Sequence, residues 1–196
     1  MWKIMLPVAL LATALASTLC VLPALAQTRV FVAAQGSDGN ACTFASPCRT
    51  FQHAHDVVAA NGEIDVLDPA GYGALTITKS ISIQGHGFSG ISVPSGATGV
   101  TINAGATDKI NLNGLILDGA GVGASGIGLL QAGSLEIANC VVRNNVFSGI
   151  ALGPTTAIRV KIKVSDTVAD DNGGHGIDPT ESNRECECNV HQGASL

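Results

Sequence analysis

The stretch Leu135–Asn145, which reads LEIANCVVRNN, decides the fold because two other stretches of the chain repeat its pattern. They are Ile110–Gly119 (INLNGLILDG) and Ile162–Asn172 (IKVSDTVADDN). Apolar side chains alternate with polar ones in all three, which is the period of a β-strand. Aligning the stretches gives two columns of small or apolar residues: Leu115, Cys140 and Thr167 in one, and Leu117, Val142 and Ala169 in the other. A repeat of this length with short strands and no helix predicts a β-solenoid.

A shorter triplet marks further coils. Ser-Gly-Ile occurs at Ser89–Ile91, Ser125–Ile127 and Ser148–Ile150, and His175–Ile177 is a fourth copy with histidine in place of serine. The copies are unevenly spaced, which is typical of a right-handed parallel β-helix, whose turns vary in length. We therefore predict an all-β fold, a right-handed parallel β-helix, with coils stacked ~4.8 Å apart over residues 63–177.

The N-terminal end of the solenoid carries a helical pattern. Thr50 is a suitable N-cap, apolar residues recur at helical spacing after it, and Gly62 follows the pattern. We predict a short helix over Phe51–Ala60 that caps the first coil, and we group it with a first strand and a cysteine loop as residues 27–62. After Ile177 the alternation stops and charge rises, so residues 178–196 are predicted to be an irregular tail.

The first 26 residues have the features of a secretory signal peptide. Lys3 gives a positive start, an apolar run follows, and Ala24–Ala26 forms a small-residue cleavage site. No later segment is unbroken and apolar over the ~18 residues that a membrane span needs, so we expect no transmembrane segment after cleavage. The protein is therefore predicted to be secreted, to a periplasm or to the outside of the cell.

The composition excludes one class of partner and weakens another. The net charge at pH 7 is −5, and aromatic residues make up 4% of the chain. An acidic chain lacks the basic footprint that nucleic-acid binding requires, so we expect no nucleic-acid partner. The only tryptophan, Trp2, lies in the leader. The scarcity of aromatic rings argues against a dedicated sugar-stacking module, and polysaccharide is kept as the expected partner of the long flank.

The cysteines point to an oxidising compartment. Cys42 and Cys48 lie in a polar, turn-rich loop, and a short-range disulfide between them is predicted. Cys140 falls in an inward column of the repeat and is interpreted as a small buried apolar residue. In the tail, Cys186, Cys188 and His191 carry donor types that suit zinc or copper. A Cys-x-Cys in an oxidised tail more often forms adventitious disulfides, so we predict no metal site.

The segment from Phe31 to Gly85 resembles the opening of secreted bacterial right-handed parallel β-helix proteins of the pectin-lyase-like superfamily. The matching elements are a first strand, a Gly-x-Asp turn at Gly36–Asp38, the cysteine loop, the capping helix and a Gly-Tyr turn at Gly71–Tyr72. The resemblance covers most of residues 29–177 and implies the fold. It implies no single function, because the superfamily includes lyases, hydrolases, epimerases, phage tailspikes and adhesins. Such proteins usually continue with more coils, so the resemblance predicts a member shortened at its C-terminus.

The end of the last repeat, VADDNGGHGIDP, contains Asp170, Asp171 and a Gly-His-Gly around His175. These residues resemble the acid–base groups of polygalacturonase-type hydrolases, where they lie on successive coils after an Asn-Thr-Asp and before an Arg-x-Lys. Here they fall on one coil, no Asn-Thr-Asp exists, and Arg159–Lys161 comes first. The repeat register favours a structural role, with His175 at a serine position and Asp171 at the first position of Asn144–Asn145, where stacked side chains satisfy a turn.

A second catalytic candidate is a column of charges. Asp118, Arg143 and Asp170 share one position of the repeat, so the two carboxylates are expected two rungs apart, ~9–10 Å. That distance is near the upper end of the ~6.5–9.5 Å separation in inverting glycosidases. An arginine between them lowers the pKa of both carboxyls, whereas a general acid needs a raised pKa. We interpret the column as a surface ion ladder.

Two classes of function stay open. A secreted protein without catalytic activity, in contact with polysaccharide or other cell-surface material, is favoured because no ordered catalytic set is found. The alternative is a degenerate or truncated polysaccharide lyase or glycoside hydrolase. A lyase needs clustered carboxylates for Ca²⁺ and a base, and the acidic residues here are spread singly over the coils. We expect no cofactor outside that lyase alternative.

Overall fold

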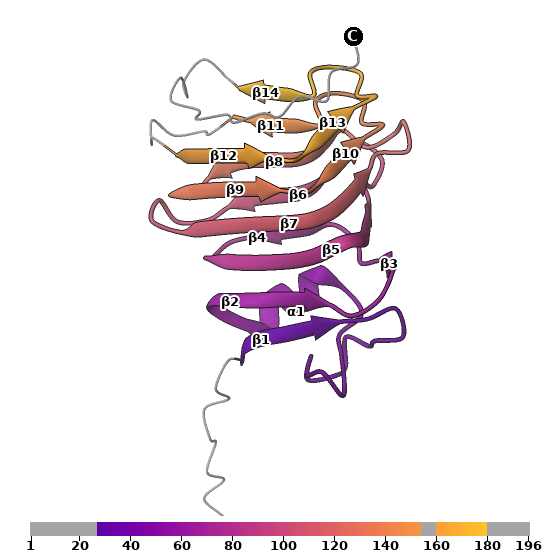
Figure 1. Ribbon diagram of the computed structural model, residues 1–196, viewed down its shortest axis with the longest axis vertical. Helices are drawn as coiled ribbons and strands as arrows, with labels where there is room; N and C mark the ends of the chain where they lie inside the picture. The colour runs from indigo at the N-terminus through magenta and orange to yellow at the C-terminus, as the bar shows by residue number, and fades with distance from the viewer. Residues whose placement is uncertain (1–26, 154–159, 180–196) are drawn as a thin grey trace, which may run out of the picture.

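The described part of the chain is a parallel β-helix of about four turns (Figure 1). A computed structural model describes residues 27–153 and 160–179. The predicted leader, Arg159 and the tail residues Cys186, Cys188 and His191 lie outside the described residues. The predicted all-β parallel β-helix with a short N-terminal helix is confirmed. None of the helices in the described ranges has the length and hydropathy that crossing a membrane requires.

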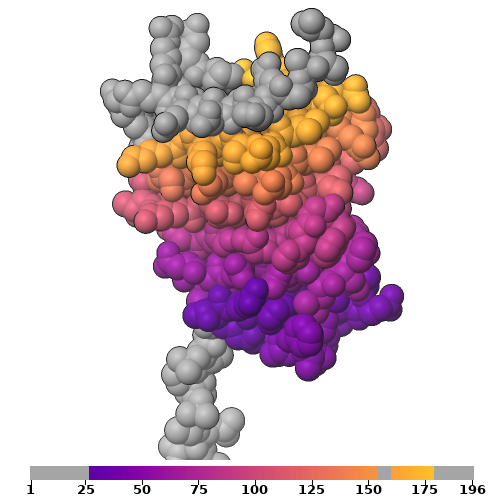
Figure 2. All heavy atoms as spheres, viewed as in Figure 1, coloured from indigo at the N-terminus to yellow at the C-terminus, as the bar shows by residue number. Residues whose placement is uncertain are grey.

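Two sheets form the walls of the helix, and every pairing between their strands is parallel. The first sheet contains β1 (Gln27–Val32), β2 (Val58–Val66), β3 (Ala70–Gly71), β5 (Ile81–Ser92), β7 (Lys109–Asp118), β9 (Ser134–Ala138), β10 (Val141–Arg143), β12 (Lys161–Ser165) and β13 (Val168–Asp170). The second contains β4 (Leu75–Ile77), β6 (Thr98–Asn103), β8 (Ser125–Gln131), β11 (Ile150–Leu152) and β14 (Ile177–Pro179). Figure 2 shows the coils as layers stacked in sequence order along the long axis.

The core is built of apolar columns that run along the helix axis. The strand registers place one residue of each coil directly above its counterpart in the coil below. The longest column is at most 1% exposed and consists of Val30, Ile64, Ile83, Leu112, Ile137 and Val164. Because strand side chains alternate, the residues between these core positions face outward and form the polar flank of the helix.

The registers confirm the aligned repeats and correct one triplet. Val142 pairs with both Leu117 and Ala169, as the alignment predicts. The serine triplet at Ser89 was wrongly assigned, because Ser89 pairs with Leu115 in the first sheet, whereas Ser125 pairs with Thr98 in the second. Ser-Gly-Ile triplets occur in both sheets, so the three residues alone do not determine which sheet a triplet joins.

The capping helix is shorter than predicted. α1 spans Phe51–Val57, and Thr50 is its N-cap, with its hydroxyl oxygen accepting the His53 backbone N–H at 3.2 Å. The helix does not reach Ala60, because Val58 is already extended and begins β2, which pairs with β1 and β5. Parallel pairing on both sides of β2 therefore overrides the local helical pattern.

Two buried side chains fix the helix and the repeat in place. His55 in α1 is 3% exposed, and its Nε2 accepts the Thr78 backbone N–H at 3.2 Å. Cys140 is 1% exposed, and the Leu115 N–H lies 3.5 Å from its Sγ. Burial raises the pKa of the Cys140 thiol to about 11, so this cysteine is a neutral core residue, as the repeat alignment indicated.

Candidate functional site

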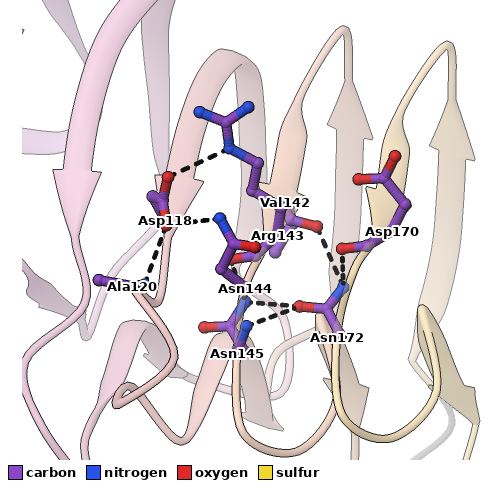
Figure 3. A network of polar contacts seen from close by, with 8 residues as sticks. All are labelled: Asp118, Ala120, Val142, Arg143, Asn144, Asn145, Asp170 and Asn172. Atoms are coloured by element: carbon purple, nitrogen blue, oxygen red, sulfur yellow. Dashed lines mark hydrogen bonds and ion pairs between the residues drawn. The ribbon is translucent and has the colours of Figure 1, made fainter.

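The charge column lies where the repeat places it. Arg143 on β10 pairs with Asp118 on β7 and with Asp170 on β13. The Arg143 guanidinium turns toward Asp118, and its Nε lies 3.1 Å from Asp118 Oδ2 (Figure 3). Within the described residues the Asp170 carboxylate has no ion pair, and in Figure 3 it stands apart from Arg143 and Asp118 with no contact drawn between them. The column is thus one ion pair with a neighbouring exposed carboxylate.

The turn that follows β7 holds Asp118 in its ionised form. The backbone N–H of Ala120 donates to Asp118 Oδ1 at 2.9 Å, and the Asn144 side-chain amide donates to the same oxygen at 3.1 Å. These two donors, in that order, lower the pKa of Asp118, and Arg143 adds a smaller effect. A carboxyl of this kind is a poor proton donor, so Asp118 is poorly suited to be the acid of a hydrolytic pair.

The predicted asparagine stack is part of the scaffold. The Asn145 side-chain amide donates to Asn172 Oδ1 at 2.8 Å and to the Arg143 carbonyl at 3.1 Å. Asn172 in turn donates to the Asp170 and Val142 carbonyls at 2.8 and 3.1 Å (Figure 3). These amides satisfy backbone groups where the chain leaves the strand, which is the role that stacked asparagines have at solenoid turns.

The remaining hydrolase-like residues lie on the same turn. Asp171 has a positive φ of 50°, like Asn144 at 57°, and its carbonyl accepts the Asn144 N–H at 3.1 Å. His175 is exposed, and its carbonyl accepts the Gly149 N–H at 3.0 Å. Among the described residues no hydrogen bond joins the His175 ring to a carboxylate. Both residues therefore serve the turn through their backbones.

A cluster of charges that the sequence did not reveal lies on the outer face of the first sheet. Arg29 Nη2 lies 2.6 Å from Asp65 Oδ2, and its Nε lies 2.9 Å from Glu63 Oε1. His86 Nε2 lies 2.6 Å from the other oxygen of Asp65. Asp65 is therefore held between two cationic or polar groups, and its side chain is only 13% exposed.

Aromatic rings flank this charge cluster on both sides. The Arg29 guanidinium lies 5.6 Å from the centre of the Phe31 ring, and Phe31 meets Phe44 edge to face at 5.5 Å. On the other side His86 stacks on Phe88 at 5.7 Å. Phe44 is 69% exposed and Phe88 37% exposed. We call the set the aromatic–ionic patch: Arg29, Phe31, Phe44, Asp65, His86 and Phe88.

The patch could not be predicted from the sequence, because its residues become neighbours only through the register of the parallel strands. Arg29 pairs with Glu63 and Phe31 with Asp65, so residues more than 30 positions apart become neighbours. His86 and Phe88 reach the same place through a bulge in β5, where the register shifts between Gln84 and Ser89 and His86 has a φ of 56°. The signal that was present is the alternation of Arg29 and Phe31 in a strand.

A row of amides leads away from the patch across successive coils. Asn139 donates to Asn113 Oδ1 at 2.9 Å, and Asn113 donates to Gln84 Oε1 at 2.9 Å. Gln84 in turn donates to Ser82 Oγ at 3.0 Å. The row gives the outer face of the first sheet a polar strip parallel to the helix axis.

The predicted disulfide between Cys42 and Cys48 is present, and both cysteines are fully buried. The nearest ring nitrogen of His53 and the two sulfur atoms lie within 4.8 Å of one another. This is the single such group of potential metal ligands in residues 27–153 and 160–179.

Comparison with known proteins gives this chain no family. No protein-family model, no curated protein and no solved structure matches it. The resemblance to the pectin-lyase-like superfamily therefore stays a prediction from the sequence, and the function has to be argued from the geometry of the outer face.

Proposed function

We propose that this chain is an exported β-helix protein that binds polysaccharide through the aromatic–ionic patch and does not cleave it. One observation carries the proposal: two exposed phenylalanine rings, Phe44 and Phe88, lie on either side of the charges of Arg29, Asp65 and His86. Carbohydrate-binding surfaces combine the same two features, an apolar ring face and hydrogen-bonding groups beside it.

The chemistry of a sugar chain suits this surface. The C–H face of a pyranose ring packs on an aromatic ring, and its hydroxyls exchange hydrogen bonds with carboxylate and guanidinium groups. The amide row from Gln84 to Asn139 continues across the coils, so an extended polymer has polar partners beyond the patch. A polymer laid along the axis would meet one polar side chain per coil.

Binding without cleavage is supported by the state of the charge column. The pKa of Asp118 is lowered, chiefly by the Ala120 N–H and the Asn144 amide, so it holds no proton to donate near neutral pH. Export is supported by the buried Cys42–Cys48 disulfide, since such bonds persist in oxidising compartments. Membership of the pectin-lyase-like superfamily is supported by the parallel coils and the N-terminal helix.

The test is a binding screen against neutral and acidic polysaccharides, read by affinity electrophoresis and calorimetry. Phe44→Ala and Phe88→Ala should each weaken binding roughly two- to tenfold, the effect of losing one aromatic contact of about 0.5–1.5 kcal/mol. Phe147→Ala is the matched control and should leave binding unchanged. Phe147 is 64% exposed and lies between β10 and β11, at the other end of the helix from β1 (Figure 1).

Two outcomes would overturn the proposal. One is equal weakening by all three substitutions, which would place binding elsewhere, and the other is the absence of binding to every polymer in the panel. The same mixtures are assayed for new reducing ends and for unsaturated products. Release of either would favour the alternative of a degenerate lyase or hydrolase.

A further inference from the structure

We infer that Cys42, Cys48 and His53 form a zinc-binding site when the disulfide between the two cysteines is reduced. The three donor atoms lie within 4.8 Å of one another, although the cysteines and the histidine come from different elements. The cysteines belong to the loop after β1, and His53 lies in α1. Two thiolates and one imidazole are a donor set that zinc prefers.

The geometry needs only side-chain rotation. In a tetrahedral site with Zn–S bonds of ~2.3 Å, two sulfur ligands lie ~3.8 Å apart, so the two sulfurs must move apart once the bond between them is reduced. The Cα atoms of Cys42 and Cys48 are 4.6 Å apart, so their sulfurs can separate to this distance without movement of the loop. Three protein ligands leave the fourth position of the ion for water.

The backbone holds the ligands in place independently of the disulfide. The Phe31 N–H donates to the Cys42 carbonyl at 2.8 Å, and the Cys48 N–H donates to the Phe31 carbonyl at 2.9 Å. His53 is fixed by the cap of α1 through its backbone N–H. No hydrogen bond occupies its ring within the described residues, so both ring nitrogens are available to a ligand.

A neighbouring carboxylate is already in use and is not a fourth ligand. Asp38 Oδ1 accepts the backbone N–H groups of Arg49 and Thr50, each at 2.9 Å, and Oδ2 accepts the Thr50 hydroxyl at 2.8 Å. These bonds hold the loop against the start of α1. The metal would therefore join a loop and a helix that are already packed together.

A dithiol serves as the reductant of the Cys42–Cys48 disulfide. The dithiol forms its own disulfide and gives two electrons and two protons to the sulfurs of Cys42 and Cys48, which become thiols. Zn²⁺ then displaces both thiol protons and binds the two thiolates and the imidazole of His53. The ion restores the cross-link that reduction removes, and it compensates two charges that would otherwise be buried without a partner.

The experiment uses the full chain with Cys20, Cys186 and Cys188 replaced by serine, so that their thiols do not compete for the metal. A phosphine reduces the disulfide, and Co²⁺ is added as a spectroscopic probe for the zinc site. The reduced chain should bind one equivalent and show a thiolate-to-cobalt charge-transfer band, whereas the oxidised chain should show none. Zn²⁺ should displace the cobalt.

The variants separate a built site from two free thiols. His53→Ala should weaken cobalt binding about tenfold or more, since even residues that only orient a metal ligand contribute 10–100-fold. His175→Ala, which changes an exposed histidine, should bind like the parent chain. Circular dichroism of the oxidised variants verifies that both fold.

Two results would overturn the inference. The first is a His53→Ala chain that binds cobalt as tightly as the parent. The second is a reduced parent chain that gives no charge-transfer band, whether it keeps its β-sheet signal or loses it and fails to recover it with Zn²⁺. The polysaccharide assay is run on the oxidised chain, so failure of either proposal leaves the other standing.

Discussion

Buried amides at the turns contribute more to the stability of this helix than the ion pair beside them does. The side chains of Arg143 and Asp118 are 48% and 35% exposed, and exposed pairs of this kind contribute about 0–1 kcal/mol. Asn145 is 3% exposed and donates two hydrogen bonds, one to a backbone carbonyl and one to the next asparagine. Water cannot replace those bonds at a buried position, so the asparagine is the more sensitive residue.

Replacing Asn145 by alanine should therefore destabilise the fold. The substitution removes two buried hydrogen bonds, although the Arg143 carbonyl keeps the Gly119 N–H and Asn172 Oδ1 keeps the residue-145 backbone N–H. At about 0.5–1.5 kcal/mol for each lost bond, the free energy of unfolding should fall by about 1–3 kcal/mol. Urea denaturation measures the change. Asn103→Ala is the control, because Asn103 is exposed on β6 and should shift stability by less than about 0.5 kcal/mol. Equal effects of the two substitutions would show that the stack carries no special weight.

His55 should make the fold less stable in acid. Burial lowers the pKa of His55 from its ordinary value of 6.5, and the nearby positive charge of Lys79 acts in the same direction, whereas Asp56 opposes it. Below pH 6.5 the His55 ring binds a proton in the unfolded chain but stays neutral in the folded chain until the pH reaches its lowered pKa. The free energy of unfolding therefore falls as the pH drops from 6.5 toward the lowered pKa of the folded state. Protonation would also remove the acceptor for the Thr78 N–H.

Denaturation curves between pH 7.5 and 4.5 test this dependence. His55→Gln offers an amide oxygen to the Thr78 N–H but has no proton to gain, so the slope near pH 6 should flatten. His175→Gln, at an exposed histidine, should keep the parent slope. A parent slope that survives His55→Gln would assign the acid sensitivity to another group.

At the scale of the element, α1 depends on its N-cap residue, Thr50. The Thr50 hydroxyl oxygen accepts the His53 N–H, and its hydroxyl hydrogen goes to Asp38 Oδ2. Thr50→Ala removes both bonds and should lower the free energy of unfolding by about 1 kcal/mol, typical of a lost N-cap. Thr50→Ser keeps the hydroxyl and should cost less. Chemical denaturation of the three chains checks the order, and a serine variant as weak as the alanine variant would contradict the capping role.

Strands were predictable from the sequence where one repeat could be compared with another. Leu117, Val142 and Ala169 were aligned by their neighbours, and the registers agree. The Ser89 triplet was not predictable, since a bulge in β5 moves it to a different wall of the helix. The aromatic–ionic patch was not predictable for a related reason: Phe44 lies in a loop and Phe88 lies within the bulge of β5, so no period in the sequence connects them.

At the scale of the whole molecule, each coil is stabilised mainly by the coils above and below it. In an array of this kind stability is a sum of coil terms and nearest-neighbour interfaces. Ile127 pairs with Val100 on one side and Ile150 on the other, and it is fully buried. Ile177 occupies the same column, but within the described residues it pairs only with Ile150 and is partly exposed. The same residue type thus occurs in an interior coil and in the last described coil.

Alanine at these two positions should have unequal consequences. Ile127→Ala leaves a cavity between two packed coils and should cost about 2–5 kcal/mol in the free energy of unfolding. Ile177→Ala removes contacts with one coil and part of its surface already meets solvent, so its cost should be less than half as large. Urea denaturation gives both values, and amide hydrogen exchange shows where each chain opens. Fraying confined to β14 in the Ile177 variant, with global loss in the Ile127 variant, is the expected pattern. Equal losses would mean that the helix unfolds as a single cooperative unit whose last coil is as tightly coupled as its middle.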